Sequence, residues 1–302
     1  MRFFYLLLFL LITFSSYSQS RYIDDIFENK QVITKTYAQK NGEKLIVDIY
    51  QPKNDALSRR PAIIFMHGGG FAGGSPRNEG EVKFAKMAAR KGYVAVQISY
   101  RLTRKGKSFG CDYGASGKIE TFKEAATDFL DAVDYVMEHH KKFKIDTSHI
   151  IAGGSSAGAE AVLDAVYNRD LLFDNPNEKF HNFAAVFSLA GAIIDARYLD
   201  KTNAVPAILF HGTADQLVPY ATAPHHFCHS EDAGYLILDG SRTIADKLSQ
   251  LNSSYLLYTF KEAGHEISEM PFEQLPQVFQ FLKEVALDKK FIQAEVLIDE
   301  IP

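Results

Sequence analysis

The sequence has 302 residues, of which 46% are apolar and 23% are charged, and this balance excludes a disordered or fibrous protein. Lys and Arg number 33 against 37 Asp and Glu, so the formal charge of −4 lacks the positive footprint of a general nucleic-acid binder. Two cysteines are too few for a disulfide scaffold or a four-cysteine zinc site.

The first residues have the pattern of an export signal. Arg2 precedes an apolar run, Phe3–Ile12, which gives way to small and polar residues. This order predicts a secretory signal over residues 1–18 with cleavage between Ser18 and Gln19. The alternative is a membrane anchor, but the run is shorter than the ~18 apolar residues of a spanning helix. We therefore expect an exported protein, periplasmic or extracellular, without stable membrane insertion.

Strands and helices alternate through the rest of the chain. The expected strands are Val32–Ala38 and Lys44–Tyr50 around the turn Asn41-Gly42, then Pro61–Met66, Tyr93–Ser99, His149–Ala152, Phe183–Leu189, Ala207–Phe210 and Tyr255–Phe260. The expected helices are Glu81–Arg90, ended by Gly92, then Phe122–His140, an alanine-rich helix ending near Tyr167, Ser241–Leu251 and Phe272–Leu287. The tail Phe291–Pro302 has no clear pattern. This order predicts one α/β domain over residues 19–302, with a mostly parallel sheet and helices on both faces.

A glycine–serine cluster follows the expected strand His149–Ala152. In Gly154-Ser155-Ser156-Ala157-Gly158, only Ser156 stands between two glycines at the spacing G-x-S-x-G. A strand, a sharp turn and a helix start are the context in which this motif exposes a nucleophilic serine. A plain helix-start turn is the alternative. We expect Ser156 to be the nucleophile.

A second glycine cluster, His67-Gly68-Gly69-Gly70-Phe71, follows the expected strand Pro61–Met66. Consecutive glycines leave backbone N–H groups unshielded, and such donors stabilise a developing oxyanion. A flexible turn or a phosphate loop is the alternative, but no Lys-Ser/Thr pair follows. We expect an oxyanion hole formed by the N–H groups of Gly69, Gly70 and Ala157, with His67 in a structural role.

A nucleophilic serine needs a histidine and a carboxylate, and after a turn of this type the chain order is Ser, Asp or Glu, then His. Asp215 follows the strand Ala207–Phe210, and His265 follows the strand Tyr255–Phe260. We expect these two to be the acid and the base. The rival residues are Asp195 and Asp200 among the acids and His181, His211, His225, His226 and His229 among the histidines.

Four motifs together resemble the α/β-hydrolase superfamily: His67–Phe71, Gly154–Gly158, His211–Asp215 and Ala263–His265, to which Tyr100–Leu102 and Lys144–Asp146 add support. The nearest branch is the HGGG-type esterases and lipases, especially secreted bacterial feruloyl- and acetylxylan-esterase-like proteins. The resemblance implies a single-domain α/β-hydrolase fold and ester hydrolysis by Ser156, His265 and Asp215 without a metal or an organic cofactor. It does not specify the substrate.

Two longer loops are expected to rim the site. They are Thr103–Lys118, with Cys111, and Pro219–Ile237, with Cys228 and three histidines. Export permits a Cys111–Cys228 disulfide that would join the loops, and the alternative is two free thiols. The histidines suggest either a metal site or a polar specificity loop. We favour the loop, because acid partners at metal-site spacing are missing.

The segment between Ser156 and Asp215 and the chain before His67 leave no room for a large cap, so the site should be open to a bulky ester. We therefore expect a secreted serine esterase that acts on carbohydrate-linked feruloyl or acetyl esters, with a small-molecule or polysaccharide ester as substrate. The alternatives are a short-chain carboxylesterase or lipase, a serine peptidase or amidase, and a carbohydrate-binding protein with vestigial hydrolase motifs.

Overall fold

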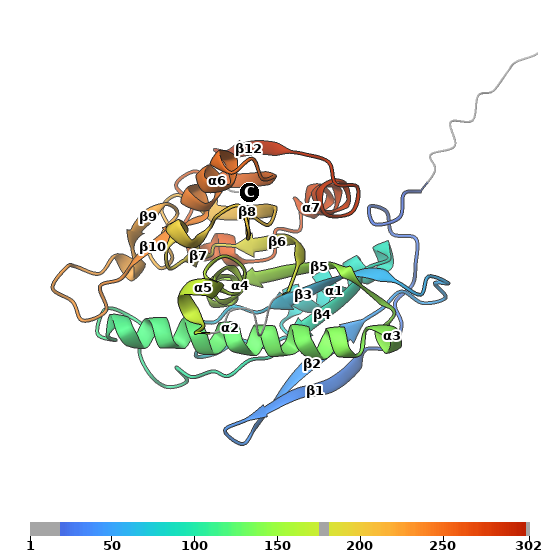
Figure 1. The fold of residues 1–302 in the computed structure, drawn as a ribbon, viewed down its shortest axis with the longest axis horizontal. Coiled ribbons are helices and arrows are strands. Elements are labelled where there is room, and N and C mark those ends of the chain that lie inside the picture. Colours follow the sequence, from blue (N-terminus) through green and yellow to red (C-terminus); the bar gives the residue numbers. More distant parts are fainter. Residues whose placement is uncertain (1–18, 175–180, 300–302) are drawn as a thin grey trace, which may run out of the picture.

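A nine-stranded sheet forms the centre of the computed structural model, which describes residues 19–174 and 181–299 (Figure 1). Its spatial order is β1-β2-β4-β3-β5-β6-β8-β11-β12. In chain order these strands are β1 (Ile33–Lys40), β2 (Glu43–Tyr50), β3 (Arg60–Met66), β4 (Val94–Ile98), β5 (Ile145–Ser155), β6 (Phe183–Leu189), β8 (Ala207–Gly212), β11 (Tyr255–Phe260) and β12 (Gln293–Ile298). The predicted export signal, residues 1–18, lies outside the described residues.

The sheet is antiparallel at one end and parallel elsewhere. β1 pairs with β2, and β2 with β4, in antiparallel register, whereas every pairing from β4 through β3, β5, β6, β8 and β11 to β12 is parallel. The predicted mostly parallel sheet is confirmed. Because parallel strands end at one edge, the loops after β3, β5, β8 and β11 lie together there.

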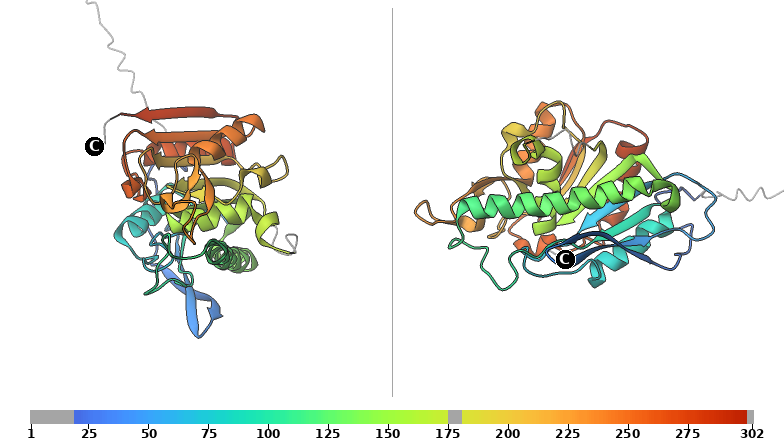
Figure 2. Two further views of the ribbon diagram at one scale, coloured as in Figure 1. Left: turned by 90° about the vertical axis from the view of Figure 1, so that its left-hand side faces the viewer. Right: turned by 60° about the horizontal axis from the view of Figure 1, so that its bottom comes forward.

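Helices cover both faces, as predicted. They are α1 (Glu79–Lys91), α2 (Ala115–Glu138), α3 (His140–Phe143), α4 (Ala157–Tyr167), α5 (Arg169–Leu172), α6 (Ser241–Gln250) and α7 (Leu275–Phe281). Successive residues of β3 face opposite cores: Ile64 packs with the core of α2, α4 and α6, and Phe65 with that of α1 and α7. α2 is the long green helix across the right-hand view of Figure 2.

Some predicted boundaries differ from the structure, and others agree. α2 begins at Ala115 instead of Phe122, so the expected loop Thr103–Lys118 ends at Gly114, because the first turns of the helix carry Gly117 and Lys118 and lack an apolar period. The last helix begins at Leu275, not Phe272, and continues as π-helical turns over Leu282–Leu287. Gly92 ends α1 in a left-handed conformation, with φ of 104°, as the sequence predicts.

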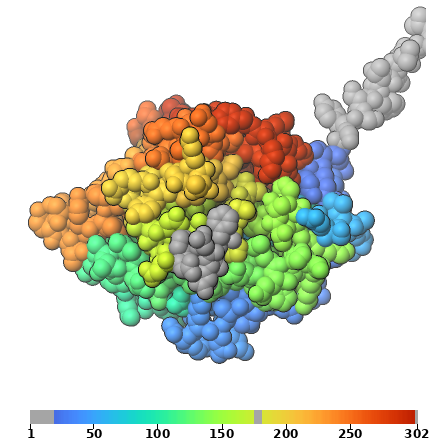
Figure 3. Space-filling view, viewed as in Figure 1, coloured from blue at the N-terminus to red at the C-terminus, as the bar shows by residue number. Residues whose placement is uncertain are grey.

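Several short strands carried no sequence signal. β12 lies in the tail that the sequence left unassigned, and its residues alternate between exposed and half-buried at the edge of the sheet. β7 (Ala192–Ile193), β9 (Thr222–Pro224) and β10 (Ile237–Gly240) form a separate three-stranded sheet. In Figure 3 the segment between β9 and β10 projects at the left of the molecule, beside the start of α2.

The connection between β5 and β8 carries no inserted domain among its described residues, which form α4, α5, β6, β7 and a short 3-10 turn. The prediction of a single α/β unit without a large cap there agrees with this. Over residues 19–174 and 181–299, none of the helices combines the length and the apolarity that a bilayer span needs.

Candidate active site

Ser156 stands at a strained turn between β5 and α4. Its φ and ψ are 49° and −125°, a region that residues with a side chain rarely adopt, and its N–H donates to Leu189 O at 2.8 Å. The flanking glycines allow close packing. A Cβ atom at Gly154 would lie 2.4 Å from Gly158 O, and one at Gly158 would lie 2.2 Å from Met66 O. The turn therefore holds the Ser156 side chain out at the carboxyl edge of the sheet.

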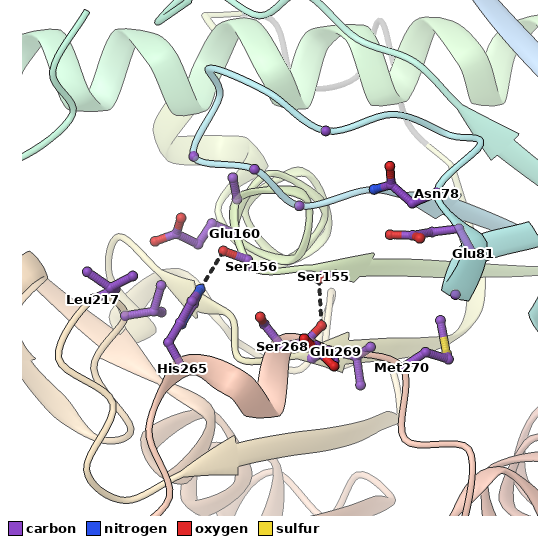
Figure 4. A pocket seen from close by; sticks show the side chains of 18 of the residues that line it. Asn78, Glu81, Ser155, Ser156, Glu160, Leu217, His265, Ser268, Glu269 and Met270 are labelled. Atoms are coloured by element: carbon purple, nitrogen blue, oxygen red, sulfur yellow. Dashed lines mark hydrogen bonds between the residues drawn. The ribbon is translucent and has the colours of Figure 1, made fainter.

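Ser156, His265 and Asp215 form one hydrogen-bonded chain. Ser156 Oγ lies 2.7 Å from His265 Nε2, and His265 Nδ1 lies 2.7 Å from Asp215 Oδ2. The dashed line between Ser156 and His265 in Figure 4 marks the first of these hydrogen bonds. An ionised carboxylate only accepts hydrogen bonds, so Nδ1–H donates to Asp215 and Nε2 accepts the hydroxyl hydrogen of Ser156. This is the arrangement in which a histidine takes a proton from a serine.

Asp215 is buried and held as a carboxylate. Its Oδ1 accepts hydrogen bonds from the N–H groups of Leu217 at 2.8 Å and Val218 at 3.0 Å. Burial by itself would raise the pKa of Asp215, but hydrogen bonds from His211 and His265, together with electrostatic attraction to these two rings, hold this pKa well below its ordinary value of 3.8. The carboxylate can therefore orient His265 at any pH above the acid range.

The loop after β3 is fixed by its own hydrogen bonds. His67 is buried, its Nδ1–H donates to Gly68 O at 2.7 Å, and its carbonyl accepts the hydroxyl of Tyr100 at 3.1 Å. Burial lowers the pKa of His67 to about 4, so the ring is neutral at pH 7. The structure agrees with a structural role for His67, because this ring braces the loop and is not among the residues that line the cavity beside Ser156.

The N–H groups expected to form an oxyanion hole are available. Gly69 and Gly70 have φ of 123° and 60°, and Ala157 is the first residue of α4. Among the described residues, no backbone carbonyl accepts a hydrogen bond from any of the three N–H groups. All three residues line the same cavity as Ser156. The arrangement can therefore offer N–H donors and a helix N-terminus to a developing negative charge.

A cavity of about 740 Å³ opens beside Ser156 and extends to both sides of it. Figure 4 shows Glu160 and Leu217 on one side of Ser156 and Asn78, Glu81 and Met270 on the other. On the first side, His225 lies against Glu160, and the Phe109 ring lies against His225 and His226. The cavity is also lined by Val218, Lys83, Glu269 and Phe272. The cavity has room for a group on each side of an attacked carbonyl carbon.

The two rim loops are joined by a disulfide. Cys111 and Cys228 are bonded, with their Cα atoms 5.3 Å apart, and the bridge links the loop before α2 to the segment between β9 and β10. His225 is buried, its carbonyl oxygen accepts the N–H of Cys228 at 3.5 Å, and both His225 and His226 line the cavity. Within the described ranges, the one group of three potential metal ligands is Cys111, Cys228 and Asp232, and its two sulfurs are bonded to each other.

Glu160 is a residue of the cavity that the sequence pattern did not predict. No acid was expected beside the histidines of the rim, but Glu160 Oε1 lies 3.3 Å from His225 Nε2. A signal was present, because Glu160 is an acid in the alanine-rich first turns of α4. Among the rival residues, His211 contacts Ser241 and Val218 and also lies 3.4 Å from Asp215 Oδ2 through its Nε2. The others have partners elsewhere: Asp195 pairs with Arg197, Asp200 accepts from Thr202, His181 pairs with Asp134, and the N–H of His229 donates to Asp232.

Comparison with known proteins agrees with this geometry. Residues 47–196 match the model of the BD-FAE family. Gut esterase 1 of Caenorhabditis elegans is 27% identical over 157 residues, which are 51% of this chain and 27% of that protein. Fumonisin B1 esterase of Sphingopyxis macrogoltabida is 29% identical over 151 residues, which are 47% of this chain and 26% of that protein. The chain thus spans about a quarter of the length of these curated relatives.

Solved structures resemble the whole fold. Esterase 2 of Thermogutta terrifontis is 21% identical, with a TM-score of 0.62 over 88% of this chain and 96% of that one. Its form phosphorylated by paraoxon matches with the same TM-score over 84% and 94%. The sheet order, the turn at Ser156 and these matches lead to one conclusion: the chain has the α/β-hydrolase fold.

Proposed function

We propose that this protein is an exported serine esterase that hydrolyses carboxylic esters, with acyl groups linked to carbohydrate as its substrates. The observation that carries the proposal is the hydrogen-bonded chain Ser156–His265–Asp215, which begins at a strained turn and opens into a cavity. The match to the BD-FAE family and the likeness to proteins named esterases support the same chemistry.

In this proposal, Ser156 Oγ attacks the ester carbonyl carbon while His265 Nε2 takes its proton. The Asp215 carboxylate stabilises the imidazolium that forms, and His265 then passes the proton to the departing alkoxide. The N–H groups of Gly69, Gly70 and Ala157 donate to the oxyanion, and each such donor typically contributes about 3–4 kcal/mol. Water activated by His265 then releases the acid from Ser156.

The substrate class is proposed from the shape and lining of the cavity. Its two sides extend from Ser156 and carry both rings and polar groups, such as Phe109 and His226 on one side and Asn78 and Glu81 on the other. A feruloyl ring or a sugar needs this mixture of apolar surface and hydrogen-bonding groups. The Cys111–Cys228 disulfide supports export, because such bonds persist in oxidising compartments.

The test compares hydrolysis of p-nitrophenyl acetate, methyl ferulate and acetylated xylan by the wild type and by Ser156→Ala. Loss of a triad serine typically lowers kcat by about 10⁶. Ser155→Ala is the matched control, since the hydroxyl of Ser155 donates to Ser268 O at 2.7 Å and should affect activity far less. Cleavage of peptides without cleavage of esters would favour an amidase, and near wild-type activity of Ser156→Ala would refute the proposal.

A further inference from the structure

Two buried polar side chains, Glu160 and His225, lie side by side at one end of the cavity. They are 2% and 0% exposed. Glu160 Oε1 lies 3.3 Å from His225 Nε2, but neither this oxygen nor either ring nitrogen of His225 has a hydrogen-bond partner among the described residues. A buried polar atom that is left unpaired destabilises the folded protein. So many unpaired atoms at one place call for a partner that the protein itself does not supply.

The surroundings make both groups neutral at pH 7. Burial raises the pKa of Glu160 to about 8, and burial together with the charge of Lys118 lowers the pKa of His225 to about 3. The rings of Phe109 and Phe122 meet the His225 ring edge-on, with centroids 5.4 and 5.9 Å away. The pair therefore offers a carboxylic acid and a neutral imidazole, each able to donate one hydrogen bond and to accept another.

The pair lies one helical turn from the nucleophile. The N–H of Glu160 donates to Ser156 O at 2.9 Å, so the two side chains are at positions i and i+4 of one helix face. Figure 4 shows the Glu160 side chain next to Ser156. Side chains at this spacing have Cβ atoms about 5–6 Å apart. A group held by Glu160 would therefore lie within a few bonds of the carbonyl carbon that Ser156 attacks.

We propose that Glu160 and His225 form a subsite for a hydroxyl group of the substrate, a few bonds from the ester carbonyl. This inference rests on the proposed esterase function. A hydroxyl both donates and accepts, and so matches two neutral groups that each do both. An alkyl group would leave these polar atoms unpaired. A cation would be disfavoured by Lys118, whose Nζ is buried nearby and donates to Gly234 O at 2.8 Å.

Two kinds of ester carry such a hydroxyl. A sugar or other polyol has it on the alcohol, next to the esterified carbon, and a hydroxy acid has it on the acyl group. The test measures kcat/KM for 2-hydroxyethyl acetate against propyl acetate, and for methyl glycolate against methyl propionate. Each ratio of kcat/KM values is divided by the ratio of the rate constants for hydroxide-catalysed hydrolysis of the same two esters. This removes the difference in their intrinsic reactivity. We expect the wild type to favour the hydroxylated ester of one pair by about tenfold or more, and that pair identifies the side.

The variants are Glu160→Met, Glu160→Gln and His225→Phe, with Glu231→Gln as the control, because Glu231 is exposed in the same rim segment as His225 and does not line the cavity. Glu160→Met and His225→Phe should bring the preference close to one, Glu160→Gln should keep part of it, and Glu231→Gln should keep all of it. Using a ratio cancels any effect of Glu160 on His265 that both esters share. If Glu160→Met does not fold, His225→Phe tests the same subsite.

A wild type without preference in either pair would overturn the subsite, and so would a preference that survives both Glu160→Met and His225→Phe. Either result leaves the proposed function standing if Ser156→Ala has lost ester hydrolysis. Failure of the proposed function looks different: the wild type then cleaves none of the four esters, or Ser156→Ala cleaves them as fast as the wild type does.

Discussion

Gly158, in the first turn of α4, lies directly against the carbonyl oxygen of Met66 at the end of β3. A Cβ atom at Gly158 would be 2.2 Å from this oxygen and 2.5 Å from the carbonyl oxygen of His67. This close approach joins the two halves of the candidate site, because Ser156 precedes α4 and the glycine loop follows β3. The relative position of Ser156 and the glycine loop is therefore set by backbone packing.

Gly158→Ala should consequently destabilise the protein by about 1–3 kcal/mol, since the extra methyl group meets rigid backbone. Urea denaturation followed by circular dichroism measures this change. Gly80→Ala is the control, because a Cβ atom at Gly80, within α1, would meet its nearest neighbour at an ordinary 3.7 Å and alanine favours a helix. Equal stability of Gly158→Ala and the wild type would contradict the packing argument.

The two glycines of the oxyanion loop should respond differently to alanine. At Gly69, φ is 123° and a Cβ atom would lie 2.4 Å from Gly73 O, whereas at Gly70 φ is 60° and nothing lies within 4 Å. Gly69→Ala must therefore displace the loop, and loss of one oxyanion donor lowers kcat by about 10²–10³. Gly70→Ala should leave the loop in place and lower only the stability, by about 1–2 kcal/mol, because alanine is strained in the left-handed region. Steady-state kinetics on p-nitrophenyl acetate should therefore show the larger loss of kcat in Gly69→Ala. A larger loss of kcat in Gly70→Ala would contradict the geometry.

Glu160 should make the protein less stable as the pH rises. The folded pKa of about 8 exceeds the ordinary 4.5, so between these values the folded state binds more protons than the unfolded state, and the free energy of unfolding falls with rising pH. Glu160→Gln cannot ionise and lacks this loss. Its stability relative to the wild type should therefore grow by several kcal/mol from pH 4.5 to pH 8.5, as measured by urea denaturation. If the free energies of unfolding of the two proteins changed in parallel with pH, Glu160 would ionise normally.

The bridge between Cys111 and Cys228 should stabilise the protein by up to about 5 kcal/mol, because it closes a loop with a sequence separation of 117 residues. Unfolding with and without reductant measures the effect. The double variant Cys111→Ser/Cys228→Ser should be insensitive to reductant. Peptide mapping adds a direct check: the bridged peptides gain the mass of two hydrogen atoms on reduction. Alkylation of both cysteines without reduction would contradict the bridge.

The site residues that the sequence identified lie in turns and loops that follow strands. Asp215 and His265 follow strands in the expected chain order, and the structure brings both to Ser156 because parallel strands end at one edge. Glu160 and His225 could not be paired in this way. They are 65 residues apart in the numbering, on a helix and in a rim segment, and only the packing of α4 against that segment brings them together.

For the fold, too, the sequence predicted some elements and missed others. Long apolar strands such as β6 and β11 match their predicted ranges, because burial on both faces leaves a continuous apolar run. β12 was missed because it is an edge strand with only half its residues partly buried, and the first turns of α2 were missed because Lys118 is buried there against Gly234 and not in an apolar stripe. Tertiary contacts, not local pattern, fix these elements.

The central claim is that Ser156 is a nucleophile activated by His265. The most direct measurement is reaction of the protein with a fluorophosphonate, which phosphonylates activated serines, followed by mass spectrometry of the peptide that holds Ser155 and Ser156. The account predicts one phosphonyl group per chain, on Ser156, with parallel loss of ester hydrolysis and no labelling of Ser156→Ala or His265→Ala. A label on Ser155, or ester hydrolysis that survives complete labelling of Ser156, would contradict it.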